Sequence, residues 1–191
     1  PMCRQYHRVD FIPQWTNEER PQEREVYNLW RGFEVQGKHH EEGLTDLYWD
    51  HVKQVICDGD EELYMWTRKW LAHAIQRPWE KPRTALVLRS GEGTGKDTFI
   101  QPLGDIFGKH YYTTSDIERL VGHFNGHLVN AVLIYAREAL WGGNKAAQSK
   151  IKELITDSRV SFERKGIDAF SANSCARLIV SSNEAWAVPA G

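Results

Sequence analysis

The sequence contains little cysteine, no long apolar run and no excess of charge of one sign. Its three cysteines, at positions 3, 57 and 175, are scattered and odd in number, which excludes a disulfide framework and is typical of a reducing compartment. We find no signal peptide and no apolar segment long enough to span a bilayer, so we expect no membrane partner. The formal net charge of −2 creates no global basic field, and any contact with nucleic acid is therefore expected to be local.

The length and composition are those of an ordinary globular protein. Of the 191 residues, 41% are hydrophobic and 26% are charged, which allows one domain with a real core, alone or with a helical annex. We divide the chain into an extended, aromatic segment (1–43), a helical module (44–82) and an α/β core (83–191). Apolar residues at helical spacing predict two helices in the module: Leu44, Leu47, Tyr48, Val52, Val55 and Ile56 in the first, and Leu63, Trp66, Trp70, Leu71 and Ala74 in the second.

The most informative stretch runs from Thr84 to Phe99. A short apolar run, Ala85 to Leu88, is typical of a strand buried on both faces, and alternate glycines, a lysine and helix-compatible residues follow it. In such a segment the glycines let backbone N–H groups turn inward, the helix N-terminus adds partial positive charge, and the lysine reaches the outer phosphates. The stretch therefore predicts a site for a nucleoside triphosphate. The expected contact residues are Gly91, Glu92, Gly93, Thr94, Gly95, Lys96, Asp97 and Thr98.

Two positions depart from the usual phosphate-binding loop. Ser90 occupies the place of the first glycine, and Asp97 occupies the place of the serine or threonine that normally binds magnesium. We expect Asp97 either to bind magnesium itself or to leave that role to Thr98.

A second apolar segment, residues 131–136, predicts another buried strand, and Glu138 follows its end. Strand ends converge on bound phosphates in this class of fold, where hydrolysis needs a carboxylate that orients the attacking water. The acidic pair usual at this place reads Arg137-Glu138 here. Glu138 as a plain surface carboxylate is the alternative, but the phosphate-binding pattern upstream favours a catalytic one.

The last part of the chain adds a hairpin and a third strand. Residues 160–170 form two alternating segments around Arg164-Lys165-Gly166, which is a hairpin signature. Residues 177–181 predict a buried strand, and Asn183 follows it. An amide at the tip of a strand next to the phosphate-binding strand can contact the outermost phosphate or the attacking water.

Taken in this order, the motifs resemble those of the superfamily 3 helicase domain of phage and viral primase-helicases, including the primase-polymerase type encoded by phages, plasmids and prophages. The similarity covers residues 27–191. It rests on Gly93-Thr-Gly-Lys96, Glu138-Ala-Leu-Trp-Gly-Gly143, Ile151-Lys-Glu-Leu-Ile-Thr156, Phe162-Glu-Arg-Lys-Gly166 and Ser182-Asn183. The resemblance implies an α/β fold: a P-loop NTPase core of the AAA+ type, with helices flanking a parallel sheet and a small helical module before it.

The resemblance also implies a function. Such domains form rings, usually hexameric, that hydrolyse ATP to translocate on single-stranded DNA during replication. By this resemblance Lys96 binds the phosphates, Glu138 is the catalytic base and Asn183 is the sensor.

Further site residues follow from the same resemblance. Mg²⁺ is expected to reach the site with ATP, near Asp97, Thr98 and Glu138. On the hairpin, Arg164 and Lys165 are expected to face DNA in the channel of the ring.

We expect the chain to be part of a longer polypeptide. Family members continue into an arginine-finger segment beyond the point where this sequence stops, and they carry a primase or polymerase part before it. A protein of this type encoded by a phage or plasmid acts in the cytoplasm of a bacterial host.

Two other function classes stay open. A P-loop kinase would need an arginine-rich lid after the core, and no such segment is visible in the sequence. A nucleotide-binding scaffold that has lost hydrolysis is supported by Arg137 and Asp97. ATP hydrolysis measured with and without single-stranded DNA separates the three classes.

Overall fold

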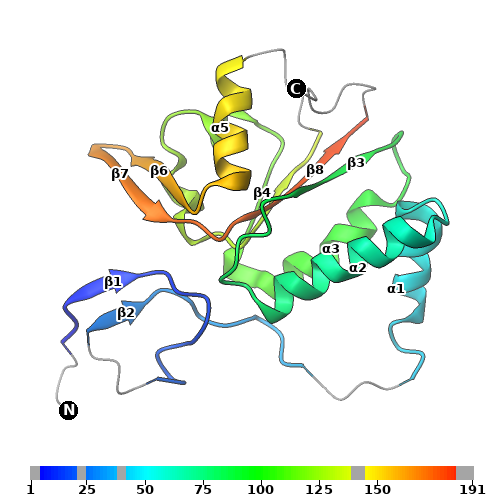
Figure 1. Cartoon of the computed structure of the whole chain (residues 1–191), viewed down its shortest axis with the longest axis horizontal. Helices are drawn as coiled ribbons and strands as arrows, with labels where there is room; N and C mark the ends of the chain where they lie inside the picture. Colours follow the sequence, from blue (N-terminus) through cyan, green and yellow to red (C-terminus); the bar gives the residue numbers. More distant parts are fainter. Residues whose placement is uncertain (1–4, 21–24, 38–41, 139–144, 184–191) are drawn as a thin grey trace.

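The structure is a computed structural model that describes residues 5–20, 25–37, 42–138 and 145–183. Its centre is a four-stranded sheet whose neighbouring strands all run parallel, in the order β3-β8-β5-β4 (Figure 1). The expected α/β fold with a parallel sheet flanked by helices is thus confirmed. The strands are β3 (Ala85–Arg89), β8 (Arg177–Ser182), β5 (Leu133–Ala136) and β4 (Tyr111–Thr114).

Helices cover both faces of this sheet (Figure 1). Helices α2 and α3 lie on one face, and α5 lies on the other face together with the hairpin of β6 and β7. The first layer consists of α2 (Glu61–Gln76) and α3 (Lys96–Phe107). The second consists of α4 (Glu118–Val121), the 3-10 helix η3 (Asn125–Asn130), α5 (Lys145–Thr156), β6 (Arg159–Arg164) and β7 (Ile167–Asn173).

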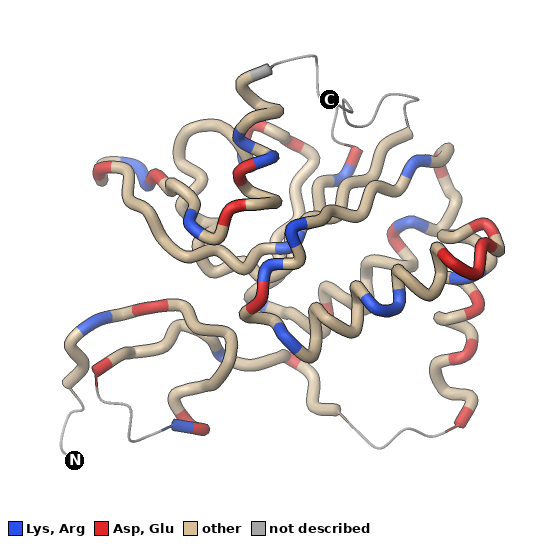
Figure 2. The backbone as a smooth tube through the Cα atoms, in the orientation of Figure 1, with Lys and Arg blue, Asp and Glu red and all other residues tan. Residues whose placement is uncertain are grey.

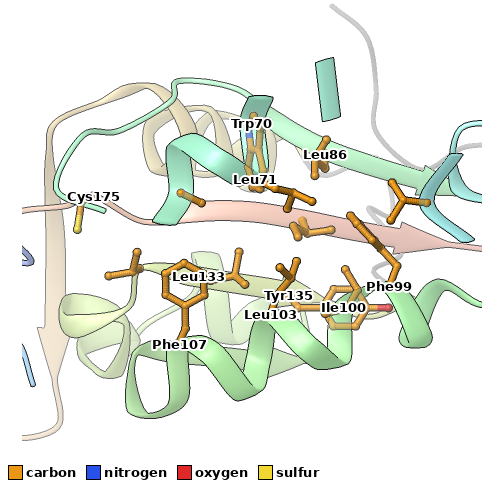
Figure 3. Packing of buried hydrophobic residues seen from close by; sticks show 14 of the residues in the cluster. Trp70, Leu71, Leu86, Phe99, Ile100, Leu103, Phe107, Leu133, Tyr135 and Cys175 are labelled. Carbon is orange, nitrogen blue, oxygen red and sulfur yellow. The ribbon is translucent and has the colours of Figure 1, made fainter. Parts of the chain in front are cut away.

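The central strands are buried on both faces because their side chains alternate. On β5, Leu133 and Tyr135 join the apolar cluster beside α2 and α3, whereas Ile134 and Ala136 join the cluster beside α5. Burial on both faces explains why these strands read as continuous apolar runs in the sequence. Figure 3 shows the first cluster, which includes Trp70, Leu71, Leu86, Phe99, Ile100, Leu103 and Phe107.

Strand β3, which precedes the glycine-rich loop, differs from its prediction. The sequence predicts burial on both faces, but β3 lies at the edge of the described sheet beside β8. Leu86 and Leu88 pack toward the cluster of α2 and α3, while Val87, on the other face, is 45% exposed. The expectation of two-sided burial is therefore wrong for this strand, because an apolar run does not reveal how many neighbours a strand has.

The helical module is present, but the buried face of its first helix differs from the predicted one. Helix α1 (Asp46–His51) continues directly into a π-helical turn, η1 (Val52–Ile56). A π-helical turn changes the angle between successive side chains, so a stripe at α-helical spacing does not stay on one face. Leu44 and Leu47 are 73% and 86% exposed, while Val52 is completely buried.

The second helix of the module also turns a somewhat different face to the core. Helix α2 begins after Asp60, whose carboxylate accepts a hydrogen bond from the backbone N–H of Leu63 at 2.9 Å. The predicted Trp70, with Leu71 and Ala74, is buried, but Leu63 and Trp66 are exposed. Tyr64 and Thr67 take their places on the buried face.

The described part of the N-terminal segment contains a small sheet. Strands β1 (Arg8–Asp10) and β2 (Val26–Asn28) pair in parallel. The completely buried side chain of Asn28 accepts hydrogen bonds from the backbone N–H groups of Ile12 and Trp30, at 2.9 and 3.0 Å. Trp30 also joins the cluster beside α2 and α3. Trp30 of the N-terminal segment thus packs on the core, while the three-part division of the chain stays a prediction.

Arg177, the first residue of β8, is completely buried. Its guanidinium donates to the backbone carbonyls of Arg77 and Glu80, both at 2.7 Å, and of Pro78 at 3.1 Å. These carbonyls belong to the segment that connects α2 to β3. Burial lowers the pKa of Arg177 to about 10, so the side chain stays charged at neutral pH. Arg177 therefore joins the central strand to the connection between α2 and β3.

Charged residues of both signs are spread along the described chain (Figure 2). Asp and Glu gather around the turn between η1 and α2, whereas the tip of the β6–β7 hairpin carries both signs. This distribution agrees with the small net charge and leaves nucleic-acid contacts to local features. Within the described ranges, every helix is either too short or too polar to cross a bilayer.

Candidate phosphate-binding site

Parallel pairing brings three strand ends to one edge of the sheet. Arg89 at the end of β3 pairs with Ser182 of β8, and Ala136 at the end of β5 pairs with Val180 of β8. The residues that follow these strands therefore emerge close together, at the edge where open α/β sheets bind ligands.

A glycine-rich loop joins β3 to α3 at this edge. Gly93 and Gly95 have φ angles of 69° and 82°, in the left-handed region that favours glycine. The hydroxyl oxygens of Ser90 and Thr94 lie 2.5 Å apart and close the loop on itself. Helix α3 begins at Lys96, so the unpaired N–H groups of its first turn face this loop.

The helical module touches the loop through His51, at the end of α1. The Nε2 atom of His51 lies 2.9 Å from the carbonyl oxygen of Gly95 and therefore donates to it. A Cβ atom on Gly95 would lie 2.4 Å from the His51 ring. Sequence reasoning missed this contact, because no local spacing relates a histidine in one helix to a glycine in a distant loop.

Lys96 points back over the loop. Its ammonium group donates to the carbonyl oxygens of Ser90 and Gly91, both at 2.8 Å, and to Oδ1 of Asn183 at 2.7 Å. These acceptors, and the Ser90 hydroxyl oxygen at 3.1 Å, are all neutral oxygens. An ammonium group binds an anionic oxygen more strongly than a neutral one. An anion in the loop would therefore compete well for Lys96.

Glu138 follows β5 at the same edge. Its backbone N–H donates to Oγ of Ser181 at 3.3 Å, and its carboxylate accepts a hydrogen bond from Nδ2 of Asn183 at 3.4 Å. The φ angle of Glu138 is 48°, which is uncommon for a residue with a Cβ atom, and such positions cluster at functional sites. Asn183 thus links Lys96 to Glu138, and these three are the residues that the sequence predicts to be catalytic.

Asp97 and Arg137 form an ion pair across the site. Nη2 of Arg137 lies 2.7 Å from Oδ2 of Asp97, and the Tyr135 hydroxyl lies 3.0 Å from Oδ1. Burial raises the pKa of Tyr135 to about 12, so this hydroxyl keeps its proton at neutral pH and donates to the carboxylate. The Asp97 and Arg137 side chains are 64% and 52% exposed, and an ion pair this exposed contributes about 0–1 kcal/mol.

The acidic side chains of the site already take part in hydrogen bonds. Both carboxylate oxygens of Asp97 already have a partner, and Oε1 of Glu138 accepts from Asn183. Nowhere in the described chain are three His, Cys, Asp or Glu side chains grouped as metal ligands. The expected positions of Mg²⁺ beside Asp97, Thr98 and Glu138 stay a prediction.

The site residues line one cavity of about 530 Å³. Gly91 belongs to the glycine-rich loop but does not line it. Tyr135 and Ser181 line it without having been predicted, because each lies inside an apolar strand rather than after its end. The lining comprises Glu92, Gly93, Thr94, Gly95, Lys96, Asp97, Thr98, Tyr135, Arg137, Glu138, Ser181 and Asn183.

The residues predicted to contact DNA do not line this cavity and lie on the hairpin. Lys165 and Gly166 form the turn between β6 and β7, and Gly166 has a φ angle of 76°, so the predicted hairpin is confirmed. The guanidinium of Arg164 folds back over the ring of Phe170, 5.4 Å from its centre. Lys165 is exposed at the tip, and it is the better placed of the two for a contact outside the chain.

Comparisons with known proteins agree on one group of relatives. The sequence profile of a family of unknown function, DUF5906, matches residues 88–191, which is more than half of the chain. A protein named DNA primase-polymerase, from Nitratiruptor phage NrS-1, is 26% identical over 118 residues, which make up 60% of this chain and 16% of that protein.

Solved structures of the same phage protein share the fold. An apo structure of the NrS-1 C-terminal region matches with a TM-score of 0.77 at 21% identity, over 95% of this chain and 44% of that one. A second, A-form apo structure of the region matches with a TM-score of 0.72 at 21% identity, over 92% of this chain and 42% of that one. The chain therefore spans less than half the length of each of these relatives.

Alanine substitutions in the glycine-rich loop are expected to separate backbone strain from crowding. Gly91→Ala should change stability little, because its Cβ would meet nothing within 4 Å and its φ angle is not left-handed. Gly93→Ala should cost about 1–2 kcal/mol from its left-handed φ angle alone. Gly95→Ala should cost more than Gly93→Ala, because its Cβ also meets His51. Urea unfolding measures all three variants.

A second substitution isolates the crowding. His51→Ala combined with Gly95→Ala should recover only the part of the loss that is due to the imidazole ring. Equal stability of the Gly91→Ala and Gly95→Ala variants would show that the loop does not have this conformation.

Proposed function

The chain belongs to DUF5906, a family of unknown function, and we propose that it is the nucleoside triphosphate-binding core of a phage-type DNA replication protein. One observation carries the proposal. Lys96 of α3 and Glu138 after β5 are joined through Asn183 after β8, at 2.7 and 3.4 Å, at the mouth of a glycine-rich loop. The arrangement supplies a cation for phosphate, a carboxylate for water and an amide between them.

In this proposal a P-loop of the NTPase type holds ATP. The N–H groups at the start of α3 and the positive end of the helix dipole face the phosphates. Lys96 exchanges the carbonyls of Ser90 and Gly91 for phosphate oxygens, which form stronger, charge-assisted hydrogen bonds. The cavity of about 530 Å³ lies within the range of roughly 300–1,000 Å³ typical of small-molecule sites.

Glu138 is the proposed base for hydrolysis. A base must lie within hydrogen-bond reach of the water that attacks the outermost phosphate. The contact of the Glu138 backbone with Ser181 and that of its carboxylate with Asn183 fix it beside the loop. In this proposal Asn183 responds to the outermost phosphate, and its contacts with both Lys96 and Glu138 support this role.

We further propose that hydrolysis drives a superfamily 3 type helicase ring, usually hexameric, along single-stranded DNA. The order of the motifs supports this proposal, and the similarity to the NrS-1 primase-polymerase supports a role in phage DNA replication. A neighbouring subunit would supply the arginine finger, and a primase or polymerase part would belong to the same full-length chain. Such a protein works in the cytoplasm of an infected or plasmid-bearing bacterium.

A nucleotide-binding scaffold without hydrolysis is the second candidate function. It is favoured by one specific observation, the Arg137–Asp97 pair at 2.7 Å. Arg137 stands where hydrolytic members of the P-loop class usually carry an acid that organises the metal ion.

Hydrolysis by the natural full-length protein distinguishes the two candidates. Glu138→Gln is expected to keep ATP affinity and to slow hydrolysis by roughly a hundredfold or more, because it removes a positioned base. Steady-state phosphate release with and without single-stranded DNA measures the effect, and Glu62→Gln on the exposed face of α2 is the control. DNA-stimulated turnover in the wild type would support the motor, and ATP binding without turnover would support the scaffold.

Lys165→Ala tests the hairpin. The variant is expected to weaken single-stranded DNA binding about equally for all sequences, because a phosphate contact carries no base information. It should also lower the slope of log affinity against log salt by about 0.7 per contact. Lys69→Ala, on α2 at the opposite face of the sheet, is the matched control. If both variants bind DNA with the affinity and salt slope of the wild type, the hairpin has only a structural role.

A further inference from the structure

Two positions of the site carry charges that differ from those of the usual phosphate-binding pattern. Asp97 replaces a neutral hydroxyl residue at the start of α3, and Arg137 replaces an acid after β5. The two side chains meet at 2.7 Å. The exchange thus brings a guanidinium group to the wall of the cavity, beside the proposed base.

Arg137 lies between two adjoining hollows. It lines the cavity of about 530 Å³ with Lys96 and Asn183, and it also lines a second cavity of about 440 Å³ with Thr114 and Arg119. A guanidinium group has five N–H donors, and Nη2 is the one that contacts Asp97. The remaining donors leave Arg137 able to bind a second anion.

The pair with Asp97 is easily exchanged. Both side chains are more than half exposed, so water screens their attraction and little free energy is lost when they separate. A terminal phosphate offers three oxygens and a larger negative charge than a carboxylate. Arginine binds such a group in a planar, bidentate way.

The order of the strands decides which phosphate Arg137 meets. The loop and Lys96 lie at the end of β3, Asn183 at the end of β8 and Arg137 at the end of β5, across β8 from the loop. A polyphosphate whose inner groups were held by the loop would therefore bring its outermost group near Asn183 and Arg137.

We propose that Arg137 is a phosphate-binding residue that rests on Asp97 in the empty site and moves to the outermost phosphate of a bound nucleoside triphosphate. Arg137 then makes the site prefer a triphosphate over a diphosphate, and Asp97 competes with the nucleotide for it. This inference rests on the proposed nucleotide-binding function.

Nucleotide titrations of the chain test the proposal. Fluorescent analogues of ATP and ADP are titrated in EDTA and again with MgCl₂, and thermal melting confirms that each variant is folded. Arg137→Ala is expected to weaken ATP binding by about tenfold or more and ADP binding by less than about threefold, because only ATP loses a charge-assisted contact. Arg119→Ala, which removes a nearby arginine from the second cavity alone, should leave both affinities unchanged.

Two further variants make the test specific. Asp97→Asn frees Arg137 and should tighten ATP binding in EDTA by a few-fold. In a double-mutant cycle, this gain in affinity should be smaller when Arg137→Ala is also present. Arg137→Lys keeps the charge without the planar fork and should keep part of the preference for ATP.

The outcomes separate this inference from the function on which it rests. A wild-type chain that binds neither nucleotide would overturn both. If the wild type binds ATP but Arg137→Ala binds it equally well, loses ATP and ADP to the same extent, or behaves like Arg119→Ala, only the role of Arg137 is overturned.

Discussion

The parallel pairing of β3, β8 and β5 is the constraint on which the candidate site depends. Because the three strands run parallel and their ends lie side by side, the glycine-rich loop, Asn183 and Glu138 reach the same edge of the sheet. Arg177 reinforces this arrangement, since its buried guanidinium joins β8 to the carbonyls that follow α2. The connection into β3 and the central strand that carries Asn183 are thus held by the same side chain.

Much of the core was predictable because its signals are local. Apolar runs predicted β3, β5 and β8, and the glycine turn at Gly166 predicted the hairpin. Because Glu138 and Asn183 are polar and follow two of these strands, they could be expected at the same edge of the sheet. The exposure of Val87 was not predictable, because strand order depends on contacts between distant segments. The predicted buried face of the first helix was also wrong, because its apolar spacing gives no sign of the π-helical turn that follows α1.

The contacts that complete the site are the part that sequence reasoning missed. His51 contacts the loop from another element. Tyr135 lies among apolar residues in its strand, so the sequence does not indicate that its hydroxyl donates to Asp97. Asp97 and Arg137 each stood out as a departure from the usual pattern. Only the fold shows that the two departures compensate each other, because it places them 2.7 Å apart across two elements.

The central claim is that Lys96 and the glycine-rich loop bind the phosphates of a nucleoside triphosphate. Titration of a fluorescent ATP analogue into the wild-type chain and into Lys96→Ala tests it most directly, with Lys69→Ala as a control for the loss of one positive charge. The account predicts saturable binding to the wild type and to the control, and a loss of affinity of at least about tenfold in Lys96→Ala with the fold intact, because a charge-assisted phosphate contact is removed. Equal affinity of the wild type and Lys96→Ala for the analogue would contradict it.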